Sequence, residues 1–131
     1  DEKGSEHINM FAFEVWWISD FNSFINQEKA VLNIDAIEET ELLMITREDY
    51  ENLMVKIPLM DRYFRILYQN SLVTKDYRLM VSNSFTAEEK YTQFAQKNAD
   101  IIQRIPHNLI ASYLGLAPET VSRIRKKISF K

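Results

Sequence analysis

The most regular feature of this sequence is an apolar repeat that begins after Pro58. Its members are spaced alternately by four and three positions, which is the a/d spacing of a heptad seam. They are Leu59, Tyr63, Ile66, Asn70, Val73, Tyr77 and Met80. A second apolar stripe, formed by Met60, Phe64 and Leu67, runs beside the seam. The pattern predicts one helix of about 24 residues that needs a partner on each of two faces.

Two kinds of packing satisfy this periodicity. A core helix of a monomer would show the same spacing as a helix that pairs with a second copy of the chain. Asn70 lies in the middle of the seam. One buried polar residue at such a position can fix both register and oligomeric state, which favours the helix–helix dimer.

Composition bounds the class of protein. The chain has 131 residues, of which 46% are hydrophobic and 27% charged, so a packed core is expected rather than disorder. It has no cysteine, which excludes disulfides, cysteine-ligated zinc and iron–sulfur clusters. No apolar run approaches the roughly 20 residues of a membrane span, and the first residues, DEKGSEHINM, lack the features of a secretory signal. We expect a cytoplasmic protein that does not enter the membrane.

The first 46 residues show a pattern typical of β-strands. Apolar and polar residues alternate loosely in residues 8–17 and again in residues 30–46. Residues 20–23 and 26–29 are the expected turns. These strands are too few for an independent sheet, because their edges would stay open. We therefore expect the end of a larger sheet whose first strands lie upstream.

Helix signals begin at Thr46. Thr46-Arg-Glu-Asp resembles a capping box, and the helix that it starts should end before Pro58. Residues 82–84 should break the long helix, after which Thr86 starts another with a full capping box. The buried face of that helix would contain Tyr91, Phe94 and Ala95. Asp100 should cap a short helix over residues 101–105, which Pro106 ends or restarts.

Charge is segregated along the chain. The formal charge is −8 over residues 1–46, +1 over residues 47–99 and +4 over residues 100–131, which leaves −3 for the whole chain. A basic C-terminal segment behind an acidic N-terminal one predicts that only the C-terminal segment faces a polyanion.

That basic segment has the spacing of a helix-turn-helix. Ala111 stands where two helices must approach closely, and Gly115 can take the positive φ that a tight turn requires. Val121 and Ile124 would anchor the second helix, and Pro118 falls in its first turn, where a missing N–H costs nothing.

The outward residues of the second helix carry groups that read DNA. Arg123 can donate two hydrogen bonds to a guanine, and Glu119 can accept one from a cytosine amino group. Thr120, Ser122, Lys126 and Lys127 would meet phosphates. The same residues also fit an ordinary helical hairpin with a basic end, in which Glu119 and Arg123 form a surface ion pair.

The run IASYLGLAPETVSRIRKK, residues 110–127, resembles the helix-turn-helix of the bacterial Crp/Fnr transcription regulators, and residues 115–123 are its specific part. Residues 16–46 resemble the end of that family's cyclic-nucleotide-type β-roll, and the heptad helix resembles its dimerisation helix. The resemblance implies a dimer on a near-palindromic site. The side-chain chemistry of this segment and the resemblance together predict ten DNA-binding residues. They are His107, Asn108, Ala117, Pro118, Glu119, Thr120, Ser122, Arg123, Lys126 and Lys127.

We therefore predict an α+β protein with three parts. Residues 1–46 would be the C-terminal part of an effector β-roll, residues 47–82 the connecting and dimerisation helices, and residues 83–131 the DNA-binding domain. In the family's nucleotide-binding form an Arg-Ser pair grips the cyclic phosphate. Residues near that position here are Lys29, Ala30 and Val31, which cannot form a bidentate fork. Cyclic AMP is not expected as a ligand, and no cofactor is identified.

The predicted function is a homodimeric, sequence-specific transcription regulator that reads an inverted repeat. Expected partners are double-stranded DNA, a second copy of the chain and an unidentified small-molecule effector, with RNA polymerase as a further candidate. His7 and His107 have no neighbouring acids at metal-ligand spacing, and no nucleophile–base arrangement appears, so neither a metal site nor an enzyme is expected. The alternative is a ligand-sensing or protein-interaction module whose helix-turn-helix binds a protein partner.

Overall fold

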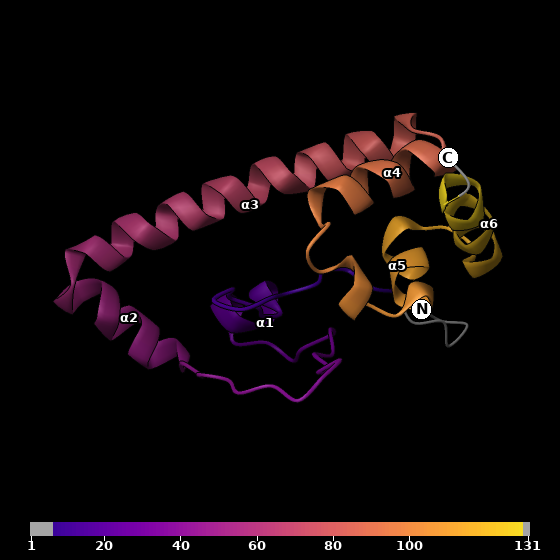
Figure 1. The fold of residues 1–131 in the computed structure, drawn as a ribbon. Coiled ribbons are helices and arrows are strands. Elements are labelled where there is room, and N and C mark those ends of the chain that lie inside the picture. Colours follow the sequence, from indigo (N-terminus) through magenta and orange to yellow (C-terminus); the bar gives the residue numbers. More distant parts are fainter. Residues whose placement is uncertain (1–6, 130–131) are drawn as a thin grey trace. The chain divides into compact units, whose positions relative to one another are not determined.

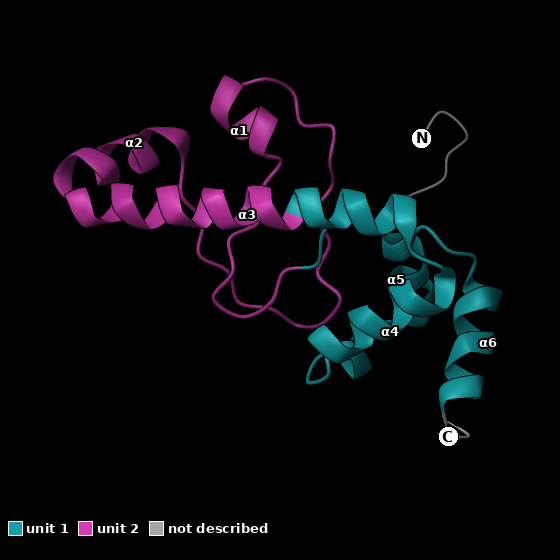
Figure 2. Cartoon of the chain, turned by 90° about the horizontal axis from the view of Figure 1, so that it is seen from above, with its two compact units in different colours: residues 1–11, 75–131 teal, residues 12–74 magenta. Residues whose placement is uncertain are grey.

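The computed structural model describes residues 7–129, and every regular element within them is helical (Figure 1). The elements are α1 (Phe21–Asn26), α2 (Arg47–Lys56), α3 (Pro58–Ser84), α4 (Ala87–Lys97), the 3-10 turn η1 (Ile102–Arg104), α5 (His107–Leu114) and α6 (Pro118–Ser129). Of the described residues, 7–11 and 75–129 form one compact unit and 12–74 form another, with α3 contributing to both (Figure 2).

The expected α+β fold with a partial β-roll is wrong. Apart from α1, residues 7–46 are irregular wherever the structure describes them, and residues 1–6 lie outside the described part. Apolar side chains in the predicted strand region face solvent, with Val31 83% exposed and Leu43 97% exposed. Alternation favours a strand only where a neighbouring strand can take up the backbone hydrogen bonds. No described segment pairs with residues 30–46 in this way, so the pattern does not produce a sheet.

Asp20 organises the start of the N-terminal region. The predicted turn at residues 20–23 is instead the beginning of α1, and one Asp20 carboxylate oxygen accepts the Ser23 N–H at 3.2 Å. The other oxygen accepts the N–H groups of Val31 at 2.9 Å and Leu32 at 3.1 Å. The bond from Val31 is the main cause that lowers the pKa of Asp20. One carboxylate therefore both caps α1 and ties residues 31 and 32 to its start.

The unit formed by residues 12–74 has an aromatic core. Phe64 is 3% exposed, and its ring centroid lies 5.1 Å from that of Trp17 and 5.0 Å from that of Tyr50. The Tyr68 hydroxyl donates to the Tyr50 hydroxyl at 3.2 Å. Burial, followed by this hydrogen bond, raises the pKa of Tyr68. Phe64, the central member of the second apolar stripe of α3, thus lies at the centre of this aromatic core.

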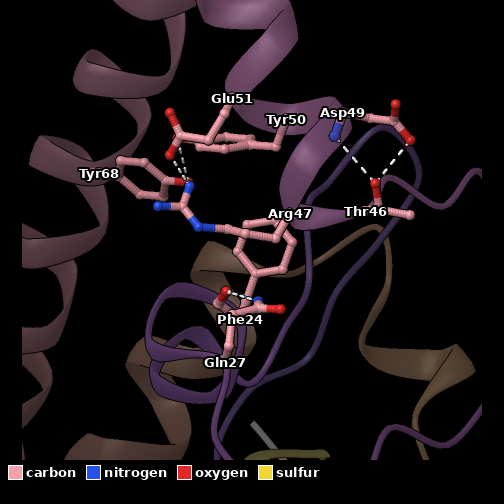
Figure 3. Close-up of polar contacts among 8 residues, drawn as sticks. All are labelled: Phe24, Gln27, Thr46, Arg47, Asp49, Tyr50, Glu51 and Tyr68. Carbon is pink, nitrogen blue, oxygen red and sulfur yellow. Dashed lines mark hydrogen bonds and ion pairs between the residues drawn. The ribbon is translucent and has the colours of Figure 1, made fainter.

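Helix α2 starts and ends where local signals predict. The Thr46 hydroxyl accepts the Asp49 N–H at 3.1 Å and donates to the Asp49 carboxylate at 2.8 Å (Figure 3). Within the helix, Arg47 pairs with Glu51 (Figure 3). The helix ends at Lys56, before Pro58. An aspartate at the third helical position therefore substitutes for the usual glutamate in bonding the capping residue.

The heptad seam of α3 remains largely exposed within one chain. Leu59 is 73% exposed and Val73 is 68% exposed. Among the described residues, two seam side chains form hydrogen bonds: the Trp17 ring N–H donates to the Tyr63 hydroxyl at 3.2 Å, and the Tyr77 hydroxyl donates to Gln93 Oε1 at 2.6 Å. The helix ends at Ser84, inside the segment 82–84 where the sequence predicts its end. Serine and asparagine weaken a helix interior because their side chains compete for backbone hydrogen bonds.

The remaining unit is built on α4, α5 and α6. Helix α4 has the predicted capping box between Thr86 and Glu89, and it buries Tyr91 and Phe94. The helix expected to start at Asp100 is only the 3-10 turn η1, which has no side-chain cap. The ring of Phe11 packs on Phe94 and Tyr113, so a short N-terminal segment completes this core.

Candidate nucleic-acid interface

Helices α5 and α6 form a helix-turn-helix around four buried residues. Ile110, Ala111 and Val121 have no exposed surface, and Ile124 is 6% exposed. Ala111 has the smallest of these side chains, as expected where two helix backbones approach closely. The residues predicted to anchor the second helix are therefore the ones that α6 buries.

The turn between the helices depends on Gly115. This residue adopts the left-handed conformation, with φ 66° and ψ 35°, and its N–H bonds to the Ser112 carbonyl at 3.1 Å. The Leu116 N–H bonds to the Ala111 carbonyl at 2.9 Å. Glycine takes this conformation without the steric cost that other residues incur. Pro118 is the first residue of α6, where no N–H is needed.

The outward side of α6 presents the predicted base-reading groups together. Glu119, Ser122, Arg123 and Lys126 are exposed and, with Pro118, line a shallow hollow on the surface. Within the described part of the chain, no ion pair joins Glu119 to Arg123. The surface ion pair expected for an ordinary helical hairpin is therefore not formed. Both side chains are thus available to an external ligand.

The flanks of this face are tied to neighbouring helices. Lys127 Nζ lies 2.6 Å from Glu88 Oε2 on α4. On the other flank, the Arg125 guanidinium contacts Nε2 of His107 at the start of α5. Partial burial and then the positive charge of Arg125 lower the pKa of His107, which favours the neutral ring as hydrogen-bond acceptor. Lys127, predicted to meet a phosphate, therefore has an acidic partner inside the chain.

The other predicted DNA-binding residues lie near the same helix pair. Asn108 is exposed in the first turn of α5, Ala117 is exposed in the turn, and Thr120 is half-buried on α6. The sequence did not indicate Glu88 or Arg125 as part of this site. Their contacts join residues 39 and 18 positions apart, and no local spacing rule reveals such pairs.

The described residues form neither a metal-binding cluster nor a membrane-spanning helix. No group of three or more histidine or acidic residues that could hold a metal ion occurs among residues 7–129. No helix in that range has both the length and the apolar character needed to cross a membrane.

The fold and the surface of α6 define a helix-turn-helix module whose outward face is polar and carries Glu119, Arg123 and Lys126. The chain is similar to the transcriptional regulatory protein btr of Bordetella pertussis, with 22% identity over 109 residues. The match covers 75% of this chain and 45% of that protein, so the chain spans less than half the length of the curated relative it matches. No family model and no solved structure matches the chain. Membership of the Crp/Fnr family stays a prediction.

Proposed function

We propose that this chain is a transcription regulator that binds specific DNA sequences through α6. One observation carries the proposal: α6 buries Val121 and Ile124 while it presents Glu119, Ser122, Arg123 and Lys126 to solvent. A recognition helix requires this division between an inward apolar side and an outward polar side. The similarity to a transcriptional regulatory protein supports the same class.

The chemistry of the outward residues divides into two roles. Arg123 can donate two hydrogen bonds to O6 and N7 of a guanine, and Glu119, one turn earlier, can accept from a cytosine amino group. Ser122 and Lys126 can contact phosphates, which position the helix and carry no sequence information. Sequence preference therefore depends on Arg123 and Glu119.

The proposed active species is a homodimer joined along α3. Most of the heptad seam is exposed, and Leu59, Ile66 and Val73 would be covered by a second copy of the same helix. Two recognition helices related by two-fold symmetry then read an inverted repeat. The seam supports this arrangement because, among the described residues, Leu59 and Val73 stay more than two-thirds exposed in a single chain.

The test is a selection of genomic fragments by the full chain, followed by titration of the enriched duplex and a scrambled duplex at two salt concentrations. We expect an inverted repeat bound at least about 10³-fold more tightly than the scrambled control. Both affinities should fall as salt rises, because phosphate contacts release counterions. Equal affinities for the two duplexes would contradict sequence-specific binding. Absence of any salt-sensitive binding would favour the alternative of a protein partner.

A further inference from the structure

A carboxylate from another helix occupies one edge of the DNA-facing side of α6. Glu88 lies in the first turn of α4, and its Oε2 is 2.6 Å from Lys127 Nζ. The two side chains are 47% and 59% exposed. The ion pair therefore forms at the surface, where an incoming anion can reach the same ammonium group.

The position of Lys127 on α6 explains why this pair matters for DNA. Lys127 directly follows Lys126, which lines the outward hollow with Arg123. At 100° per residue, Lys127 falls beside that hollow, on the same flank as the half-buried Thr120. A phosphate that follows this edge of the helix would meet both Lys127 and its carboxylate partner.

Glu88 changes the charge balance at that edge. Its carboxylate neutralises Lys127 and repels a phosphate that approaches the same ammonium group. The free Lys126 and Arg123 side chains have no such partner among the described residues. The two adjacent lysines of α6 are therefore unequal, although the sequence shows them as equivalent.

We propose that Glu88 is an autoinhibitory residue that masks Lys127 from phosphate and so limits the sequence-independent affinity of α6 for DNA. The inference rests on the proposed function. Removal of the Glu88 charge releases Lys127 for one more phosphate contact on any duplex. Because binding to random DNA consists almost entirely of phosphate contacts, its affinity directly reports this release.

The experiment is a double-mutant cycle in the full chain with Glu88→Gln, Lys127→Gln and the double variant. Each protein is titrated with a short mixed-sequence duplex across a salt series. Glu88→Gln should bind about 2- to 5-fold more tightly at low salt. The slope of log K against log salt should steepen by about 0.9, the value for one further phosphate contact. The same change should be absent when residue 127 is glutamine.

Two controls separate masking from other effects. Glu48→Gln, an exposed acid in the first turn of α2, removes the same charge from the other unit and should leave the slope unchanged. Circular dichroism checks that Glu88→Gln keeps its helices. A gain that persists in the Lys127→Gln background, or no gain at all, would overturn the masking by Glu88.

A second readout distinguishes failure of this inference from failure of the proposed function. Elution from a heparin column measures the availability of basic side chains to a polyanion, whether or not the chain binds DNA. Glu88→Gln should elute at higher salt than the wild type, and Lys127→Gln should cancel the difference. Equal elution of wild type and Glu88→Gln would overturn the masking even if no duplex binds. Later elution with no duplex binding would contradict the DNA-binding function alone.

Discussion

At the scale of single residues, Arg123 and Lys126 should have different effects on DNA recognition. Both are exposed on the outward side of α6, but only the guanidinium can bond two atoms of one guanine. Arg123→Ala should cost roughly 1–3 kcal/mol on the selected operator and relax the preference at one base pair. Lys126→Ala should weaken operator and scrambled DNA about equally and lower the salt slope by about 1.

Titration of every single-base variant of the operator measures this difference. Arg123→Ala and Lys126→Ala serve as controls for each other, because each removes one positive charge from the same helix face. Equal losses on operator and scrambled DNA for both variants would refute the assignment of Arg123 to base recognition.

His107 should make the stability of the helix-turn-helix depend on pH. Partial burial and the neighbouring Arg125 lower its pKa below the ordinary value near 6.5, so the folded state prefers the neutral ring. The unfolded chain binds the proton more readily, so this contribution is fully present above about pH 6.5. It is lost as the pH falls through the lower folded-state pKa. The thermal midpoint should therefore fall as the pH decreases from about 7.5 to 5.5.

The variant His107→Gln isolates this effect. It removes the titrating ring, so part of the pH dependence of the thermal midpoint should disappear. His7→Gln is the matched control, because it removes the other histidine of the chain. If His107→Gln and wild type show identical pH profiles, burial and the neighbouring Arg125 do not lower the pKa of this ring in the folded state.

At the scale of elements, predictions from the sequence succeed where the deciding contacts are local. The caps at Thr46 and Thr86 each involve residues three positions apart, and the turn at Gly115 depends on its own φ. The helix-turn-helix core follows from the same short spacings. These features could be predicted because the residues that decide them lie within one or two helical turns.

The predictions fail where a structure depends on distant partners. Residues 30–46 have the composition of strands, but a strand exists only with a second strand beside it. The pair between Glu88 and Lys127, and the contact of Arg125 with His107, each need two helices brought together by the fold. A single sequence contains no spacing rule for such contacts, so the electrostatics of the site could not be predicted.

The proposed dimer interface along α3 should be lost when a charge enters the seam. Val73 is 68% exposed in one chain, so Val73→Glu should leave the single chain folded. In a dimer the new carboxylate of each copy would be buried without a partner, which is costly. The dimer dissociation constant should rise about 100-fold or more, as measured by sedimentation equilibrium.

Ser71→Glu is the matched control for this substitution. Ser71 is exposed on the same helix but lies off the heptad seam, so its replacement should leave the dimer intact. If both variants dimerise like the wild type, the seam of α3 is not the interface.

At the scale of the whole molecule, the charge distribution means that the proposed affinity for DNA must come from one segment of the chain and not from its net charge. The chain carries a net charge of −3, and most of its excess of bases lies in residues 100–131, which carry +4, against +1 for residues 47–99. One such segment gives weak binding, whereas two held by a dimer act on the same duplex and gain from their effective concentration. The distance between the two recognition helices then decides which DNA spacing is accepted.

This reasoning predicts a strict dependence on the spacing of half-sites. Two recognition helices of a symmetric dimer fit half-sites about 34–36 Å apart, which is about one turn of DNA. Insertion of about five base pairs between the half-sites turns one of them to the opposite face of the duplex, so affinity should fall close to the value for scrambled DNA. Val73→Glu, as a monomer, should bind the original and the altered operator equally well. A wild-type chain that tolerates the insertion would show that each helix reads its half-site independently, because a dimer of fixed geometry cannot follow a half-site around the duplex.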